Sequence, residues 1–474
     1  MQMQYQPYKN LPPLAGLCQM HEAMVPGLSV ETCVARLKRI HFIFRGLHQI
    51  FIARLTAEPI YELKMGFSLH AHYCAEHTST FRKRVGEMRE PPLGLDQIPH
   101  RDLQRLLDEV LAAPTTGELL RGVYGVILPA LGLCLENHLK ATNPLVDQPS
   151  IRICKFALLE IREMIDYGEQ CLAQLLTPET LFQTQEWTDY LGSLMDGAGG
   201  LDGASEPKPH NLDPRYSAQP YSYEGHPKRD GRFSDPYNMG VNAEVFLYDP
   251  QYAPEPKTLM MFYKRLREID VPEMMASIIY ETKNKPWDYY RDMTRQLWDE
   301  ARHAMMGEVG FVNLGLDWRK VMVNFTWSLA LNTQLKPLER HAVLYFIEQG
   351  LMPRSGKRFE WEIGLASHNP LAALFQDYDW ADEVLHAKIG RDWYVKQFQN
   401  ATTAVEYGDE CWSRVLMDWE SWRKDGLTQH RNWWTDLYLD ACKQWGIEPD
   451  QKVLAFNTTY QSIRADLKNV SGSA

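Results

Sequence analysis

Two nine-residue stretches of the chain repeat each other and carry side chains that can bind metal. Residues 299–307 read DEARHAMMG and residues 382–390 read DEVLHAKIG, so both follow the pattern D-E-x-x-H-A-x-x-G. Glu-x-x-His occurs nowhere else in the sequence. Because residues three apart share one face of a helix, each repeat can offer one carboxylate and one imidazole to the same ion. The repeats therefore predict a centre that holds two metal ions.

The other shared residues have structural consequences. Asp299 and Asp382 precede the glutamates and cannot lie on the same helix face. Each could instead reach the histidine of the other repeat and accept a hydrogen bond from the ring N–H that faces away from the metal. The Ala and Gly after each histidine leave little bulk, which favours the close approach of a neighbouring helix.

A two-metal centre of this kind needs four helices, of which two supply Glu-x-x-His and two supply a single Glu. Apolar periodicity and proline positions predict such helices in the C-terminal half of the chain. The predicted helices are 258–285, with a kink at Pro272, then 287–309, 337–351 and 371–398. A crossover at 310–335 separates the two hairpins and is expected to be helical over 318–331.

The position of the first hairpin turn selects the partner of Glu300. In an antiparallel hairpin, residues equidistant from the turn lie level. Counting from Pro286 as the turn selects Glu273, whereas Glu268 would lie about one turn too far away and Glu281 too close to the turn.

The partner of Glu383 is Glu348 by the same argument, because their midpoint falls near Ala366 within the second connection. Glu348 also has apolar neighbours on its helix, with Glu339 as the alternative. The predicted ligand set is Glu273, Glu300, His303, Glu348, Glu383 and His386. Oxygen and nitrogen ligands in this mixture favour iron or manganese over zinc. Which glutamates bridge the ions stays open.

The predicted fold class is all-α, with four regions. These are an N-terminal helical bundle (1–186), a Gly-, Pro- and Tyr-rich ordered loop (187–256), the metal-binding bundle (257–398) and a Trp-rich helical tail (399–474). Helices are expected at 31–57, 60–88, 101–112, 117–141 and 149–176, a strand at 243–249, and no helix in the rest of the loop.

The N-terminal bundle carries its own potential ligands but lacks Glu-x-x-His. A second metal site there is the weaker interpretation, and ordinary half-buried histidines are the stronger one. The residues concerned are Glu62, His70, His72, Glu76, His77, Glu136, His138, Glu160 and Glu163.

Composition restricts the function classes. The chain has 474 residues, 45% of them hydrophobic, and a formal net charge of −11, which argues against a nucleic-acid surface. We expect no apolar run long enough to span a membrane and no signal peptide. Eight scattered cysteines without C-x-x-C fit reduced thiols in the cytoplasm and provide no iron–sulfur or rubredoxin-type electron relay.

These motifs resemble the ferritin-like superfamily of carboxylate-bridged di-iron proteins, and in particular a bacterial branch with paired D-E-x-x-H motifs. In that branch an early Glu is followed by a Pro-aromatic helix start, D-E-x-x-H, E-x-x-G-L and a second D-E-x-x-H. Here the corresponding positions are Glu273, Pro286-Trp287, 299–303, 348–351, which reads EQGL and is one residue shorter than the pattern, and 382–386. The likeness covers about 257–398 and implies a ferritin-like four-helix bundle. The N-terminal half and the loop at 187–256 lie outside the region of likeness.

The resemblance implies two iron ions, with a Mn/Fe pair as an option, that activate O2 to oxidise or hydroxylate a small substrate. Electrons would then come from an external reductase, and a homodimer is possible. The motifs are not specific for one reaction. The alternative is a non-catalytic metal-binding or assembly protein with a structural di-metal site; iron storage and zinc hydrolysis fit less well.

Overall fold

The protein is helical throughout the part described by the computed structural model, which comprises residues 5–89, 94–350, 352 and 356–460. These residues contain no strand, only one isolated bridge between Val241 and Thr459. The all-α prediction is therefore confirmed. The eight cysteines form no disulfide, as expected for reduced thiols.

The chain divides into two compact units whose boundaries differ from the predicted ones. Unit 1 comprises Met1–Phe51 and His70–Ser222, and unit 2 comprises Ile52–Leu69 and Tyr223–Ala474. The tip of the first long helical hairpin thus belongs to unit 2, and the irregular loop is divided between the two units. Tertiary contacts set this division, and a composition change along the chain does not reveal it.

Unit 1 is built mainly from long helices that agree with the predicted ones within two residues. Its elements are α1 (Met20–Ala23), α2 (Val30–Leu55), α3 (Tyr61–Glu87), α4 (Arg101–Leu111), α5 (Thr116–Leu120), η3 (Arg121–Ile127), α6 (Leu128–Ala141), α7 (Gln148–Leu175), α8 (Pro178–Gln183) and α9 (Gln185–Gly197), preceded by two short turns, η1 (Tyr8–Asn10) and η2 (Leu14–Gly16). Helix α6 packs along α7, and α4 packs along α9.

One helical stretch contradicts the expectation that no segment could span a membrane. Thr116–Ala141 is the single candidate among the described residues, with a mean hydropathy of 1.5 in its most apolar window. Of that window, 61% is buried inside the protein. A buried core helix can have the length and composition of a membrane-spanning helix. The burial of this window favours a core helix.

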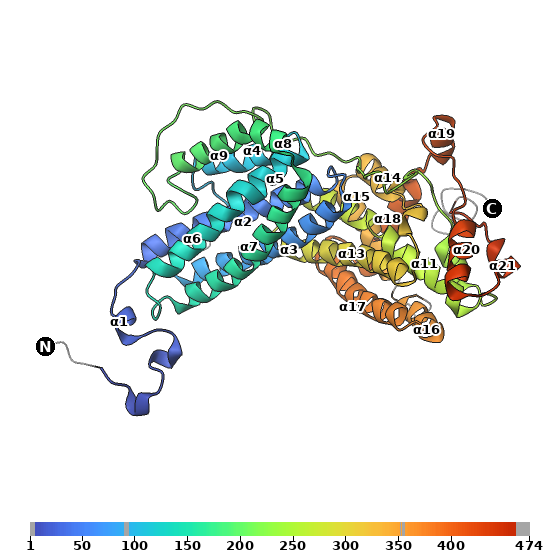
Figure 1. The fold of residues 1–474 in the computed structure, drawn as a ribbon, viewed down its shortest axis with the longest axis horizontal. Helices are drawn as coiled ribbons and strands as arrows, with labels where there is room; N and C mark the ends of the chain where they lie inside the picture. The colour runs from blue at the N-terminus through green and yellow to red at the C-terminus, as the bar shows by residue number, and fades with distance from the viewer. Residues whose placement is uncertain (1–4, 90–93, 351, 353–355, 461–474) are drawn as a thin grey trace. The chain divides into compact units, whose positions relative to one another are not determined.

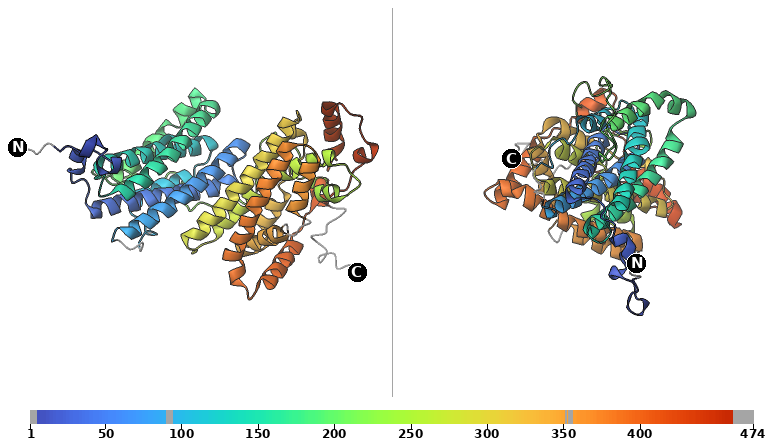
Figure 2. Two further views of the ribbon diagram at one scale, coloured as in Figure 1. Left: turned by 90° about the horizontal axis from the view of Figure 1, so that it is seen from below. Right: turned by 90° about the vertical axis from the view of Figure 1, so that its left-hand side faces the viewer.

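In unit 2 the repeats lie within a group of four packed helical segments, two of which carry them (Figure 1). The elements are α10 (Ala243–Tyr248), α11 (Pro254–Arg267), α12 (Asp270–Glu281), α13 (Trp287–Asn313), η4 (Trp318–Lys320), α14 (Thr326–Gln334), α15 (Pro337–Gly350), α16 (Lys357–Ala366), α17 (Pro370–Trp393), η5 (Val395–Gln397), α18 (Ala401–Arg414), α19 (Trp419–Lys424), α20 (Trp434–Trp445) and α21 (Gln451–Leu454). Helix α13 packs against α11, α12 and α17, and α15 packs against α12 and α17. Figure 2 shows the yellow α13 and the orange α17 side by side.

The first segment is two helices instead of one, because Pro272 interrupts it. A proline has no N–H to donate, and its ring clashes with the carbonyl four residues earlier. That carbonyl belongs to Glu268, where α11 ends, and α12 begins two residues later at Asp270. The predicted kink is therefore a complete break in the helix.

The small residues of the repeats allow the close helix contacts that we expected from them. A methyl group on Gly307 of α13 would lie 2.2 Å from the backbone nitrogen of Leu266 in α11. A methyl group on Gly390 of α17 would lie 2.3 Å from the ring of Tyr345 in α15. Any larger residue would separate these helices and shift the side chains that they position.

Three local predictions are wrong. Residues 243–248 form the helix α10, capped by the Asn242 side chain, instead of a strand. The loop contains the end of α9, which extends to Gly197. Helix α17 ends at Trp393, five residues before the predicted end of that helix.

Three other predictions lie partly outside the described residues. These are the first four residues of the loop predicted at 90–99, the last residue of the helix predicted at 337–351, and the end of the helical tail predicted at 399–474, from residue 461 onward. The helical part predicted at 318–331 is confirmed in part, by η4 and α14.

Candidate metal centre

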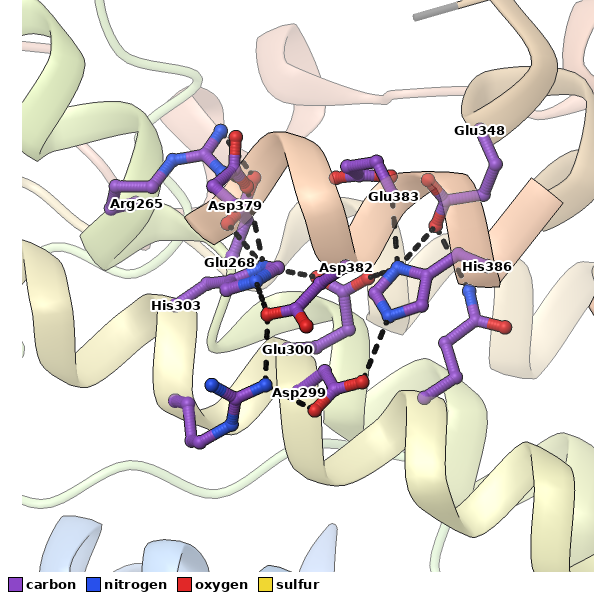
Figure 3. Close-up of polar contacts among 12 residues, drawn as sticks. Arg265, Glu268, Asp299, Glu300, His303, Glu348, Asp379, Asp382, Glu383 and His386 are labelled. Atoms are coloured by element: carbon purple, nitrogen blue, oxygen red, sulfur yellow. Dashed lines mark hydrogen bonds and ion pairs between the residues drawn. The ribbon is translucent and has the colours of Figure 1, made fainter. Parts of the chain in front are cut away.

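Two groups of potential ligands lie together in unit 2, where the repeats on α13 and α17 meet. The first group is Glu268, His303, Asp379 and Glu383, and the second is Glu300, Glu348, Glu383 and His386. Within each group the ligand atoms lie within 4.8 Å of one another. Five of the six predicted ligands belong to these groups, so the structure brings both repeats together (Figure 3).

The distances around His386 match those between ligands of one ion. Its Nδ1 lies 3.1 Å from Glu300 Oε1, 3.6 Å from Glu383 Oε2 and 3.9 Å from Glu348 Oε1. Two atoms that each lie about 2.1 Å from a metal are about 3.0 Å apart at a right angle and about 3.4 Å apart in a tetrahedron. An ion at the centre of this group would therefore contact all four side chains after small adjustments.

The group around His303 has the same spacing. Its Nδ1 lies 3.4 Å from Glu268 Oε2, 3.5 Å from Asp379 Oδ1 and 3.6 Å from Glu300 Oε2. Glu300 thus directs one carboxylate oxygen toward each histidine, and Glu383 belongs to both groups. These two glutamates are placed to bridge two ions, which the sequence had left open.

The repeats also exchange their aspartates, as the sequence predicted. His303 Nε2 lies 3.1 Å from Asp382 Oδ2, and His386 Nε2 lies 3.4 Å from Asp299 Oδ2. Because an ionised carboxylate only accepts, each Nε2–H donates to it and each Nδ1 lone pair turns toward the glutamates. Arg302 pairs with both aspartates and holds them in place.

Both Nδ1 atoms are buried and have no hydrogen-bond partner among the described residues. Burial opposes protonation, but Asp382, Glu268 and Glu300 raise the pKa of His303 to about 10. The pKa of His386 is likewise raised well above its ordinary value, against burial, by Asp299, Glu300 and Glu383. Without a metal, each ring would thus hold a second proton on Nδ1, in the place where a cation would bind.

Two of the glutamates compete for one proton. Burial and the negative charge of Glu383 raise the pKa of Glu348 well above its ordinary value. The pKa of Glu383 is lowered well below its ordinary value, against burial, by Lys357, Glu348 and His386. Gln296 donates to Glu348 Oε1 at 3.0 Å and fixes its orientation. Such strongly perturbed buried carboxylates are typical of functional sites.

Two buried cations enter the first group and distinguish it from the second. Lys357 Nζ lies 2.8 Å from Glu383 and 2.9 Å from Asp379, and Arg265 pairs with Glu268 at 2.8 Å and with Asp379. Five carboxylates in the two groups thus face two cations, which leaves three negative charges when all are ionised. Divalent ions would balance this charge, and the donor set of carboxylates and imidazoles fits iron or manganese.

Glu273 does not belong to the centre, which corrects the predicted ligand set. Its carboxylate forms an ion pair with Lys64 and a two-bond pair with Arg229, with Nη2 to Oε2 at 2.7 Å. The connection between α12 and α13 spans residues 282–286, so the turn is centred near residue 284 instead of Pro286. Counting from residue 284 places Glu268 level with Glu300.

Sequence reasoning also missed Asp379, Lys357 and Arg265. Asp379 precedes Glu383 by four residues and His386 by seven, so helical periodicity alone could have placed it on the ligand face. No local signal marks Lys357 or Arg265, because they come from other helices.

Of the potential ligands predicted in the N-terminal bundle, only His138 belongs to a candidate metal group among the described residues. His70 bonds to the Tyr124 hydroxyl at 2.7 Å, and His77 pairs with Glu160 at 2.6 Å. The one candidate group there is Cys33, His138 and Asp147, in which the Cys33 thiol donates to Asp147 at 3.0 Å. Burial raises the pKa of Cys33 to about 12, so the thiol stays protonated and the group is a hydrogen-bonded contact.

Comparisons with known proteins identify no relative. No protein-family model, no curated protein and no solved structure matches this chain.

Proposed function

We propose that unit 2 is a ferritin-like di-iron oxidoreductase that activates O2 to oxidise or hydroxylate a small substrate. One observation carries the proposal: Glu300 and Glu383 lie between two imidazoles whose unpartnered Nδ1 atoms are at ligand–ligand distance from them. A pair of Fe(II) ions held there would supply the electrons that begin the reduction of O2.

The ligand set for this proposal comprises seven side chains, one more than the sequence predicted. Glu268, His303 and Asp379 would hold one ion, Glu348 and His386 the other, and Glu300 and Glu383 would bridge. Asp382 and Asp299 keep both imidazoles in the tautomer that presents Nδ1. Because the histidines and both bridging glutamates are almost fully buried, bulk water is excluded from them.

The reaction requires a separate electron donor. In a hydroxylation, one oxygen atom of O2 enters a C–H bond and the other leaves as water, which consumes two external electrons and two protons. The cysteines of this chain are scattered and form no disulfide, and the sequence has no C-x-x-C. An external reductase is therefore part of the proposal.

The test is to load metal-free protein anaerobically with Fe(II), count bound iron per chain, and then admit O2 while recording the visible spectrum. We expect two irons and a transient visible band for the wild type. His303→Ala and His386→Ala should each lose iron and the band. His226→Ala removes an exposed histidine and should behave like the wild type. A wild type that binds no stoichiometric iron would refute the proposal.

A structural metal site is the second candidate, and the position of Lys357 and Arg265 favours it. Three of the four ligands in the first group already have a cationic partner, which could leave room for a single stabilising ion. In that case the same experiment would give one metal ion per chain, a higher unfolding temperature and no reaction with O2.

A further inference from the structure

A cavity of about 410 Å³ lies beside the metal centre and shares residues with it. Arg265, Glu268 and Lys357 line this cavity and also belong to or contact the first ligand group. The Glu268 side chain is 17% exposed, more than the other members of that group, and its Oε2 has no hydrogen-bond partner. A molecule in the cavity would therefore lie against the carboxylate that faces His303.

The wall away from the metal centre is mostly apolar. Trp327 and Trp412 stack with ring centroids 3.9 Å apart and an angle of 16° between their planes. The other apolar lining residues come from α10, α12, α14 and α15; they are Val245, Val271, Met274, Leu331, Phe346 and Ile347. The size and the apolar lining are those of a small-molecule site, which typically occupies about 300–1,000 Å³.

Trp412 provides a polar group within this wall. Its side chain is 6% exposed, and the indole Nε1–H has no hydrogen-bond partner among the described residues. Buried N–H groups are rarely left without an acceptor. The nitrogen itself is covered, so a rotation of the indole would bring the N–H to the cavity surface, where an acceptor atom on a bound molecule would satisfy it.

The cations of the cavity wall already have partners, so the wall offers no free positive charge. Arg267 pairs with Glu244 at 3.2 Å, and Lys264 pairs with Glu360. Lys357 and Arg265 are paired within the metal centre. The lining holds four cationic side chains and three carboxyl groups, Glu244, Glu268 and Asp270, so a charged ligand of either sign would meet like charges. The charge balance therefore favours an uncharged ligand.

We propose that this cavity is the substrate site and that it binds a neutral, predominantly apolar molecule with one hydrogen-bond acceptor, such as an aromatic ketone or amide. The substrate role rests on the function proposed above. Binding to the cavity does not, because no residue of its apolar wall is a metal ligand.

The first test measures binding to metal-free protein with three matched probes: acetylnaphthalene, ethylnaphthalene and the naphthoate anion. Displacement of a neutral, solvatochromic naphthyl ketone dye gives their affinities. We expect one dye per chain and the affinity order ketone, then hydrocarbon, then anion. Val271→Trp should abolish binding by filling the cavity, whereas Val312→Trp, at an exposed position of α13, should not. Equal binding in these two variants, or preference for the anion, would overturn the proposal.

Trp412→Phe tests the acceptor while keeping an aromatic ring against Trp327. We expect about tenfold weaker binding of the ketone, the usual scale of one lost hydrogen bond, with no change for the hydrocarbon. Equal losses for both probes would refute the role of the indole N–H.

The second test asks whether the cavity adjoins the metal. Co(II) is loaded in place of iron, and its visible spectrum is recorded with and without acetylnaphthalene. A ligand-dependent spectral change supports the substrate site, and an unchanged spectrum at saturating probe overturns it. If the probe binds metal-free protein but the protein takes up no iron or cobalt, the cavity stands and the proposed oxidoreductase function fails.

Discussion

Replacing Lys357 by methionine should strengthen metal binding and weaken the metal-free protein. Lys357 is buried, and its ammonium group contacts Asp379 and Glu383 at 2.8–3.0 Å. An ion that binds the same carboxylates would lie about 4 Å from it. Unit charges at that separation repel by about 4 kcal/mol at an effective dielectric constant near 20, and a divalent ion by about twice as much.

Movement of the long lysine side chain relieves part of this repulsion. We therefore expect Lys357→Met to bind Mn(II) at least about 100-fold more tightly, which corresponds to about 2.7 kcal/mol. Without metal, the variant leaves buried carboxylates uncompensated, which typically costs about 3–5 kcal/mol. The thermal midpoint of the metal-free protein should fall on the order of 10 °C.

The assay combines electron paramagnetic resonance of free Mn(II) with thermal unfolding at increasing Mn(II). Lys64→Met is the matched control, because Lys64 is equally buried and paired with a glutamate, Glu273, outside the centre. It should lose similar stability, keep wild-type Mn(II) affinity and gain no extra stability from the metal. Unchanged or weaker Mn(II) affinity in Lys357→Met would refute the reasoning, as would equal rescue of both variants.

Three further predictions follow from the site and from unit 1. Glu268→Gln should reduce bound Fe(II) from two ions to one per chain, whereas Glu273→Gln should bind two with a lower unfolding temperature; the reverse pattern would restore Glu273 as the ligand. Asp382→Asn should weaken metal binding by roughly 10–100-fold, because the imidazole N–H then donates to a neutral amide instead of an ionised carboxylate, and wild-type affinity in a direct Mn(II) titration would contradict this role. Burial lowers the pKa of His41 and His48 to about 3. Since the unfolded chain protonates them first, the contribution of these two histidines to metal-free stability should be complete above about pH 6.5 and be lost between about pH 6.5 and 3. His41→Phe should flatten this fall in thermal melts, and an unchanged slope would contradict it.

Local sequence determined the elements that carry the chemistry. The spacing of three residues in each repeat places Glu300 with His303 and Glu383 with His386 on one helix face, whatever the fold around them. Two equivalent repeats that face each other also exchange their aspartates, so the pairing of Asp382 with His303 was predictable. Pro272 marked the break in the first segment because its effect on a helix is local.

Only the tertiary structure decided which other residues complete the centre. Counting along a hairpin depends on the centre of its turn, and an error of two residues there moves the position level with Glu300 by four, from Glu268 to Pro272, which is next to Glu273. Lys357 and Arg265 reach the carboxylates from α16 and α11, and no spacing along the chain encodes such a contact. Short segments are equally undetermined: residues 243–248 form a short apolar run that could be a strand, but the Asn242 cap and packing against α11 make them helical.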